Sequence, residues 1–584
     1  GRTSAPLTPM QERIVFVEQL YPGRSVYNAP SGHRLTGSLD VPNFEAAFRD
    51  MVARQSALRT TFGPAPSGGA PVQRISARLD FELPLVDLSA LAPEQREQEL
   101  SERMQQIADL PIDIEAGPLF HATLYRLGPQ EHAFVFVPHH LVWDGWSFDL
   151  YQKELSALYL ARTSGQPHGL PEPAMSLGDY ADWLDRWMVS PQYQSQLDFW
   201  KQRFASARPA KSLGTDMPRQ AGMSGAGAMN LVSVDAATTG RLHQLAQQLD
   251  VTLSMLTLAV FAVMMADAID SDTVVIANPV RGRESPELEP VMGFFNNVVP
   301  LPFEIDRGQS FGSFARLVKT QILEVMRHQQ IPFERLVAEP EFSPHVAGGG
   351  IYQGLFSFQD VRERPKAFCG LEHRQIHLLQ RGATDDLSLW LMEKPTGLEG
   401  AVTFNADIFL PETGLAFRDR YLELLRVAAN GADTSIGQLL AAPDSASAAR
   451  LRQLSAQPAQ AAQQASQPTR KQAEESMMLL MPEQAQLAQV WASVLGIDVN
   501  DIHPTDNFFD LGGDSLLAMR AIAQAEQTLG NRVEPRRYVF ESLAQLSVPV
   551  APIEAMIATK PAAQPDNRPR GGLLGRMMSA LGKK

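Results

Sequence analysis

Cysteine is almost absent from this sequence. Cys369 is the only one among 584 residues, which excludes a framework of internal disulfides and a zinc site built from several cysteines. We therefore predict no metal site, and we expect Cys369 to be an ordinary packing residue.

Long apolar runs and a basic surface are also missing. The longest apolar stretch, residues 255–266, is too short to cross a bilayer, and the N-terminal residues lack the charged-then-apolar layout of a signal peptide. The formal net charge is −14, and no cluster of basic residues is evident, which argues against a nucleic-acid partner. We expect a cytoplasmic protein that binds neither membrane nor nucleic acid.

Two adjacent histidines, His139 and His140, follow an apolar run at residues 134–138. A run of this length predicts a buried strand, and Asp144 followed by Gly145 indicates a turn. The histidines are therefore expected where a strand ends in a loop, a common position for catalytic residues. Histidine is also the side chain whose ordinary pKa best suits proton transfer near neutral pH.

This segment resembles the HHxxxDG motif of the condensation domains of nonribosomal peptide synthetases, in the chloramphenicol acetyltransferase-like superfamily. Other segments resemble further motifs of that family, in the family's order. They include Thr8, Gln11 and Arg13 with Tyr27 and Asn28, then Arg54, Leu58, Arg59, Thr60 and Phe62, and residues 180–183, 279–283, 293–297, 329–334 and 356–359. Gln55 and Ser56 replace a histidine and a glutamate that are usual in the second motif.

The resemblance implies an α/β fold in which two acetyltransferase-like lobes form a V. The condensation domain would occupy residues 1–440, with an N-lobe at about 1–175 and a C-lobe at about 176–440. Strand-like residues 273–277 and a helical pattern at 253–269 independently indicate α/β structure. Composition and periodicity do not show the two lobes.

The resemblance also places His140 between a donor thioester and an acceptor amine, as the catalytic residue. An α-amino group titrates near pH 8 and is largely protonated at neutral pH, so its proton must be held or removed. His140 could act as a general base. It could instead orient the amine or stabilise the tetrahedral intermediate, and the sequence does not choose between these roles.

The neighbouring motif residues are expected to support His140. His139 should face into the fold and hold the loop by hydrogen bonds. The family pattern makes Asp144 the buried partner of an arginine, which is Arg283, with Arg281 as the weaker candidate. Gly145, which has no Cβ, would let the backbone approach the substrate tunnel closely.

Residues 506–516 resemble the attachment site of a peptidyl carrier protein. Ser515 follows a Gly-Gly turn and precedes a helical pattern, so its hydroxyl would stand at a helix N-terminus, where backbone N–H groups favour a phosphodiester. The resemblance implies 4'-phosphopantetheine on Ser515, with Gly513, Asp514 and Leu516 around the attachment point.

Apolar faces at residues 487–495 and 538–546 predict further helices, so a small all-α carrier domain is expected at 479–550. Residues 441–478 are rich in Ala, Gln and Ser, and we predict a flexible linker with a reach of about 30–35 Å. The tail, residues 551–584, is Pro-rich and then basic. It is either a frayed end or a short docking helix for a partner synthetase.

No adenylation signature lies between the two units. The resemblance therefore implies a phosphopantetheinyl transferase, an adenylation or other loading enzyme acting in trans, and an upstream donor carrier protein as partners. We predict a condensation–carrier didomain, an acyltransferase that forms an amide with the amine held on its own carrier. The alternatives are an ester-forming or epimerising member of the superfamily, or a non-catalytic docking platform.

Overall fold

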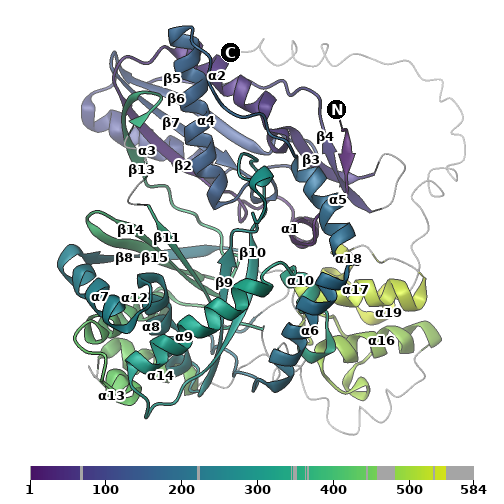
Figure 1. The fold of residues 1–584 in the computed structure, drawn as a ribbon. Helices are drawn as coiled ribbons and strands as arrows, with labels where there is room; N and C mark the ends of the chain where they lie inside the picture. The colour runs from purple at the N-terminus through teal and green to yellow at the C-terminus, as the bar shows by residue number, and fades with distance from the viewer. Residues whose placement is uncertain are drawn as a thin grey trace, which may run out of the picture.

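The computed structural model of the chain shows an α/β assembly and a group of helices near its C-terminal end (Figure 1). The described residues are 2–65, 70–219, 224–342, 345, 351–361, 364, 367–441, 445–456, 481–513, 515–530, 533 and 535–547. Both the predicted α/β class and the predicted all-α C-terminal unit are confirmed.

A six-stranded sheet forms the centre of the N-lobe. Its order is β12 (Ala367–Phe368), β13 (Leu371–Ile376), β2 (Ser31–Thr36), β7 (Glu131–Pro138), β6 (Phe120–Gly128) and β5 (Leu85–Asp87). Neighbouring strands are antiparallel except β5 and β6. The apolar run at 134–138 lies in β7 and is buried along its whole length, which explains why it does not alternate with polar residues.

Strands β12 and β13 correct the predicted lobe boundary. They belong to the stretch expected in the C-lobe, yet β13 pairs antiparallel with β2. Without β13, strand β2 would be an edge with unpaired backbone groups. Side chains of the two strands are also within hydrogen-bond distance, since His33 Nδ1 of β2 lies 2.8 Å from His373 Nε2 of β13. The N-lobe is therefore not formed by residues 1–175 alone.

A second six-stranded sheet forms the C-lobe. Its order is β10 (Asn297–Glu304), β9 (Thr273–Val280), β11 (Gly354–Asp360), β14 (Leu387–Lys394), β15 (Gly397–Asn405) and β8 (Gly227–Asp235). Strand β11 runs parallel to both of its neighbours, β9 and β14. The sheet thus has a parallel centre and antiparallel edges.

Helices cover both sheets. In the N-lobe they are α2 (Val41–Arg54), α3 (Pro93–Asp109) and α4 (Gly145–Ser164), and in the C-lobe α7 (Ala236–Leu249), α8 (Leu253–Ala268), α9 (Phe311–Val325), α12 (Pro411–Ala428) and α13 (Ile436–Ala441). Helix α8 is apolar on nearly every side and buried, as expected for a helix inside a core. Its first turn is capped by Thr252, whose hydroxyl accepts a hydrogen bond from Met255 N at 3.2 Å.

Helix α14 (Ala446–Ala456) corrects the predicted linker. Ala448, Leu451 and Leu454 recur at three-residue spacing and are buried, and the helix contacts α8 and α12. A short apolar stripe hidden among Ala, Ser and Gln therefore anchors this segment to the C-lobe. Residues 457–478, the rest of the predicted linker after α14, lie outside the described residues, as do the next two residues before Met481.

Several short elements lie between the lobes and around them. Three of them are helices of 11 to 16 residues, α1 (Pro9–Leu20), α5 (Leu177–Trp187) and α6 (Pro191–Ser206), and a fourth is the short helix α10 (Phe333–Leu336). A small sheet has the order β1 (Ser4–Ala5), β4 (Pro71–Ile75) and β3 (Thr60–Pro64). Short 3-10 turns lie at Ser56–Arg59, His140–Val142, Pro286–Leu288, Met326–His328, Pro340–Phe342 and Val499–Asp501. Helix α1 begins with a capping box made by Thr8 and Gln11.

The C-terminal helical unit contains α16 (Pro482–Leu495), α17 (Ser515–Leu529), α18 (Pro535–Phe540) and α19 (Leu543–Leu546). Its centre is aromatic: the ring of Trp491 lies 5.2 Å from Phe508 and 5.9 Å from Tyr538, measured between centroids. Helices α17 and α18 contact α1. The unit therefore rests on the N-terminal helix of the large domain (Figure 1).

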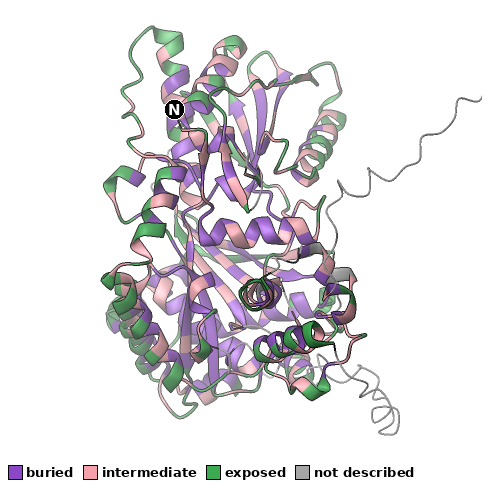
Figure 2. Cartoon of the chain, turned by 90° about the vertical axis from the view of Figure 1, so that its right-hand side faces the viewer, coloured by how far each residue is buried: buried purple, intermediate pink, exposed green. Residues whose placement is uncertain are grey.

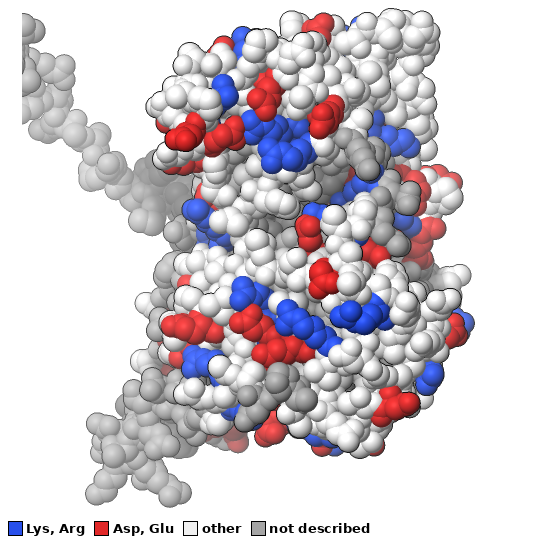
Figure 3. Space-filling model, turned by 90° about the vertical axis from the view of Figure 1, so that its left-hand side faces the viewer, with Lys and Arg blue, Asp and Glu red and all other residues white. Residues whose placement is uncertain are grey.

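Buried residues fill the sheets and the inner faces of the helices, and exposed residues lie on the outer helical faces (Figure 2). On the face drawn in Figure 3, basic and acidic side chains lie next to one another. Ion pairs also form inside the described part of the chain, where Arg34 binds Glu97 and Glu131 at 2.7 Å each. In the described part of the chain no single helix is long and apolar enough to span a membrane, although the bent pair α7 and α8 passes the same test together.

We predict that α14 is part of the folded C-lobe. Leu454→Ala should lower the free energy of unfolding by about 2–5 kcal/mol, because the side chain is fully buried and leaves a cavity. Urea denaturation followed by circular dichroism measures the change. Gln453→Ala, on the exposed face of the same helix, is the control and should stay within about 0.5 kcal/mol of wild type. Equal stability of both variants would contradict the assignment.

Candidate active site

The two histidines lie where β7 leaves the N-lobe sheet. His139 N donates to Leu119 O and His140 N donates to Tyr27 O, both at 2.9 Å. The chain then forms the 3-10 turn His140–Val142, and Asp144 caps the N-terminus of α4. The end of a buried strand and the start of a helix therefore fix the histidines from both sides.

His139 is directed into the protein. Its side chain is buried, its Nδ1 accepts a hydrogen bond from Leu141 N at 3.1 Å, and its Nε2 lies 3.5 Å from Glu18 Oε1. Both ring nitrogens thus have partners inside the fold. This geometry suits a residue that holds the turn in place.

His140 is only partly buried, and among the described residues only one of its ring nitrogens has a hydrogen-bond partner. Nδ1 lies 3.3 Å from the carbonyl oxygen of Trp143. A carbonyl can only accept, so Nδ1 carries the proton in the neutral ring and Nε2 is left with a free lone pair. Burial, followed by the neighbouring His139, lowers the pKa of His140 to about 4. His140 is therefore neutral at physiological pH.

Asp144 is buried and fully engaged by groups other than His140. Its Oδ1 accepts from Ser147 N at 2.9 Å and from Ser147 Oγ at 2.8 Å. Its Oδ2 accepts from Arg283 Nη1 and, at 3.2 Å, from Phe295 N. Arg283 is also buried and donates to Val291 O at 3.0 Å. These contacts make Asp144 one of the links between the start of α4 and the C-lobe, and they do not aim it at His140.

The other arginine considered from the sequence lies elsewhere. Arg281 pairs with Glu289, and its guanidinium lies 3.9 Å from the ring centroid of Trp146. Gly145 is the first residue of α4. A Cβ there would meet only Gln359 Nε2, at 3.7 Å, so there is space on this side of the backbone. That Gly145 borders a substrate tunnel stays a prediction.

Residues 282–296 of the C-lobe reach across to the N-lobe. Two N-lobe side chains that the sequence did not identify as site residues, Gln55 and Trp146, bind this segment. Gln55 Nε2 donates to Pro290 O at 3.0 Å, and Gln55 Oε1 accepts from Met292 N at 3.0 Å. Trp146 Nε1 donates to Glu289 O at 3.0 Å. The amide of Gln55, noted in the sequence as a departure from the family pattern, supplies a donor and an acceptor together.

Gln11 of α1 supports the histidine turn from a different direction. Its side-chain Nε2 donates to Leu141 O at 3.1 Å, and its Oε1 accepts from Thr8 N at 3.0 Å. The sequence identified Gln11 only as a motif position. Its partner lies far away in the chain, so no local pattern could show this contact.

Ser515 is the first residue of α17 and is partly exposed. Gly513 precedes it in a tight turn: a Cβ at this position would lie 2.3 Å from the Phe508 ring, so only glycine fits. Asp514 lies outside the described residues, as does the side chain of Leu516. His139, His140, Asp144, Gly145 and Arg283 thus form one constellation, and Ser515 stands on the separate helical unit.

Residues 2–451 match the family model of the condensation domain. The chain belongs to the condensation-domain family. A second family model, the phosphopantetheine attachment site, matches residues 485–547. The condensation domain is therefore followed by a carrier domain, which takes 4'-phosphopantetheine on a serine.

Relatives of the condensation domain are parts of large synthetases. One protein of the linear gramicidin synthase of Brevibacillus parabrevis is 32% identical over 436 residues, which are 74% of this chain and 8% of that protein. Phosphinothricin tripeptide synthetase PhsC of Streptomyces viridochromogenes is 32% identical over 439 residues, 75% of this chain and 40% of that protein. The chain thus spans less than half of either relative.

Solved structures show the same fold. The X-domain from teicoplanin biosynthesis has a TM-score of 0.64 at 23% identity and covers 75% of this chain and 98% of its own. The first condensation domain of the CDA synthetase has a TM-score of 0.62 at 20% identity, covering 74% and 98%. At these identities the likeness concerns the fold alone.

We predict that Asp144 stabilises the condensation domain through Arg283. Asp144→Ala should lower the free energy of unfolding by about 3–5 kcal/mol, since it leaves the buried guanidinium without its partner. Adding Arg283→Met should recover part of this loss, because both buried charges are then gone. Urea denaturation of the single and double variants measures both effects.

The exposed pair of Arg49 and Glu45, 2.9 Å apart, provides the control. Glu45→Ala should cost no more than about 0.5 kcal/mol. Asp144→Asn with wild-type stability and abolished activity would instead give Asp144 a direct catalytic role.

We predict that His140 remains neutral well below the ordinary histidine pKa. Its NMR signal should keep the neutral position from pH 8 to pH 5.5, because the pKa is lowered to about 4. Since the unfolded chain binds this proton near pH 6.5, the contribution of His140 to stability is complete above that pH and declines as the pH falls toward 4.

A titration of the 13C-histidine-labelled protein, with His140→Gln to assign the signal, measures the pKa. Exposed His168 is the internal reference. A midpoint for His140 near 6.5 would contradict the role that we assign to burial.

Proposed function

We propose that this chain forms an amide bond between an acyl thioester, delivered by a separate carrier protein, and an amine held on the arm of its own carrier domain. The observation that carries this proposal is the position of α1. This helix contacts the histidine turn at His140–Val142 and also contacts α17 and α18 of the carrier domain. One helix therefore borders both the catalytic residue and the carrier.

Apolar packing supports the contact between the two domains. Phe16 and Leu20 of α1 and Leu517 of α17 are all buried, and they belong to one apolar cluster that also includes the core of the C-lobe. The carrier thus rests on the condensation domain that precedes it. Such docking suits the acceptor carrier, whose amine must reach His140.

The residues around Ser515 fit a phosphopantetheine arm, and we assign the attachment to this serine. The hydroxyl stands on the first residue of a helix of 15 residues, where backbone N–H groups and the helix dipole favour the phosphodiester. The arm supplies a thiol that holds the aminoacyl group as a thioester. The protein itself offers none for this purpose, because its single cysteine, Cys369, is buried and burial raises the pKa of the thiol.

His140 has the geometry to act on the acceptor amine. In the reaction the amine nitrogen attacks the thioester carbonyl, the C–S bond breaks, and the donor thiol leaves with a proton. The Nε2 lone pair of neutral His140 can accept the proton lost by nitrogen and return it to the leaving sulfur. It can equally hold the amine in line by accepting a hydrogen bond. Asp144 is bound to Arg283 and Ser147, so no aspartate–histidine pair takes part.

The proposal requires partners that act in trans. They are a donor carrier protein, a phosphopantetheinyl transferase and an adenylation or other enzyme that loads the carrier, and we place the reaction in the cytoplasm. A docking partner for the C-terminal tail stays a prediction, because residues 551–584 lie outside the described residues.

Single-turnover transfer tests the proposal. The Ser515 arm is charged with an aminoacyl group from the corresponding aminoacyl coenzyme A, an acyl group is presented on a separate carrier, and intact masses of both proteins are followed. We expect the acyl group to move onto this chain. His140→Ala should slow the transfer by about two to four orders of magnitude if His140 is a base, and by less than tenfold if it only positions the amine.

The controls separate the possible failures. Ser515→Ala should accept no arm and no acyl group, and His168→Ala, on an exposed histidine, should transfer at the wild-type rate. Movement of the aminoacyl group off Ser515, with none in the other direction, would make this carrier the donor. No transfer by a fully loaded chain would favour a docking platform.

A further inference from the structure

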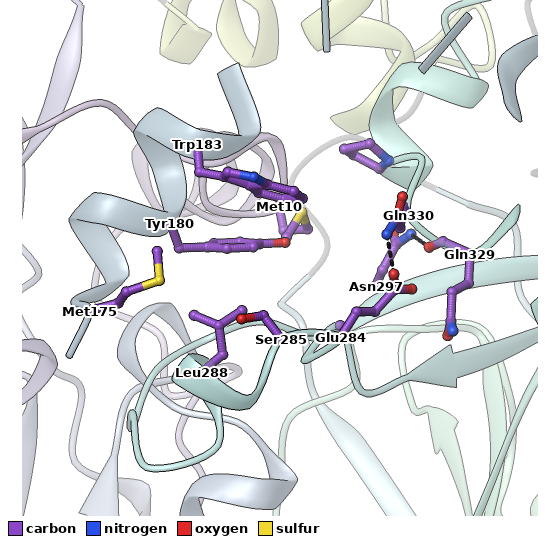
Figure 4. A pocket seen from close by; sticks show the side chains of 12 residues that line it. Met10, Met175, Tyr180, Trp183, Glu284, Ser285, Leu288, Asn297, Gln329 and Gln330 are labelled. Atoms are coloured by element: carbon purple, nitrogen blue, oxygen red, sulfur yellow. Dashed lines mark hydrogen bonds between the residues drawn. The ribbon is translucent and has the colours of Figure 1, made fainter. Parts of the chain in front are cut away.

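A cavity of about 330 Å³ lies between the lobes, and one of its walls is apolar (Figure 4). Tyr180 and Trp183 of α5 stack with their ring centroids 5.7 Å apart. The thioethers of Met10 and Met175 lie beside these rings, and Leu288 lies below them. Aromatic rings and thioethers together favour flat or branched apolar groups.

The opposite wall is polar and carries negative charge. Gln330 Nε2 donates to Glu284 Oε2, and Gln330 Oε1 accepts from Gln196 at 2.8 Å. Glu284 is exposed at the rim. None of the described residues that line the cavity is a lysine or an arginine. An anionic group in this space would therefore meet a carboxylate and no cation.

Phe294 lies near His140 and also packs with residues that line the cavity. Its ring centroid lies 6.4 Å from that of His140. The same side chain packs against the cluster that contains Leu141 and against the cluster that contains Met10 and Tyr180. Phe294 therefore links the surroundings of His140 to the cluster that contains Met10 and Tyr180, two residues of the cavity wall.

The cavity also borders the helix that contacts the carrier. Met10 belongs to α1, and α1 contacts α17 and α18. Pro332, which also lines the cavity, directly precedes α10, and α10 contacts α1 as well. The cavity thus adjoins the helix that contacts both the carrier domain and the histidine turn.

We propose that the cavity receives the side chain of the acceptor aminoacyl group and selects a large apolar one, aromatic or branched aliphatic. This inference rests on the proposed function and specifies its substrate class. The volume stands at the low end for ligand sites, which span about 300–1,000 Å³, so it holds one side chain and not a peptide. Small side chains leave the apolar wall uncovered, and acidic ones are repelled by Glu284.

Acceptor selectivity tests this assignment. The Ser515 arm is charged in turn with phenylalanyl, leucyl, alanyl and aspartyl groups, and single-turnover rates are measured with one acyl donor. The phenylalanyl and leucyl forms should react at least about tenfold faster than the alanyl form, and the aspartyl form should be the slowest. Equal rates for phenylalanyl and alanyl acceptors would overturn the proposal.

Filling the cavity should remove the preference. Met175→Trp places a large ring in the space, and the ratio of phenylalanyl to alanyl rates should fall by at least about tenfold. Val189→Trp introduces the same side chain at a position that is 86% exposed and does not line the cavity. That variant should keep the wild-type ratio. An unchanged ratio in Met175→Trp, with the protein folded by circular dichroism, would also refute the assignment.

A binding measurement separates this inference from the proposed function. Phenylalanyl-pantetheine amide, which cannot react as an electrophile, is titrated by calorimetry into the full chain carrying Ser515→Ala. We expect binding that Met175→Trp weakens at least about tenfold and that alanyl-pantetheine amide does not match. Such binding without any transfer would uphold the cavity and refute the proposed reaction. Transfer without selectivity and without binding would uphold the proposed reaction and refute the role of the cavity.

Discussion

The buried ion pair of Asp144 and Arg283 is the contact on which the candidate active site depends. A carboxylate removed from water is tolerated only when its oxygens are hydrogen-bonded and its charge is paired. Here the oxygens accept from Arg283, Ser147 and the backbone of Phe295. The start of α4 and the C-lobe segment 282–296 must therefore be in place together. The histidine turn ends two residues before this aspartate, so its geometry depends on both lobes.

The ion pair also explains why Asp144 and His140 have different contacts within the motif. Because Asp144 is bound to Arg283, it does not serve His140 as a triad acid does. His140 is left neutral, with one nitrogen fixed by the Trp143 carbonyl and the other available. In the reaction that we propose, a neutral imidazole can guide the amine without acting as a strong base, since a thioester is already activated. Support for its position comes from Gln11 of α1, the helix that the carrier contacts.

Local patterns in the sequence were enough to predict β7, α8 and the helix that begins at Ser515. Buried strands and helices show in the spacing of apolar residues, and helix starts show in the residue types that precede them. The pairing of Asp144 with Arg283 came only from family resemblance. Contacts between distant segments were not predictable: Gln55 with Met292 and Gln11 with Leu141 depend on how the lobes meet. Helix α14 was missed because its apolar stripe is short and contains an alanine.

Because β13 pairs with β2, the N-lobe sheet contains strands from both halves of the condensation domain. This affects how the domain can be divided when chimeric synthetases are made. An exchange of N-lobes between related synthetases, cut near residue 175, would transplant β2, β7, β6 and β5 but leave β12 and β13 from the original parent. The sheet of the chimera would then pair strands from two different parents. His33 would face a residue from the other synthetase at the position of His373. A chimera that respects the fold would carry the segment around residues 367–376 together with the N-terminal half.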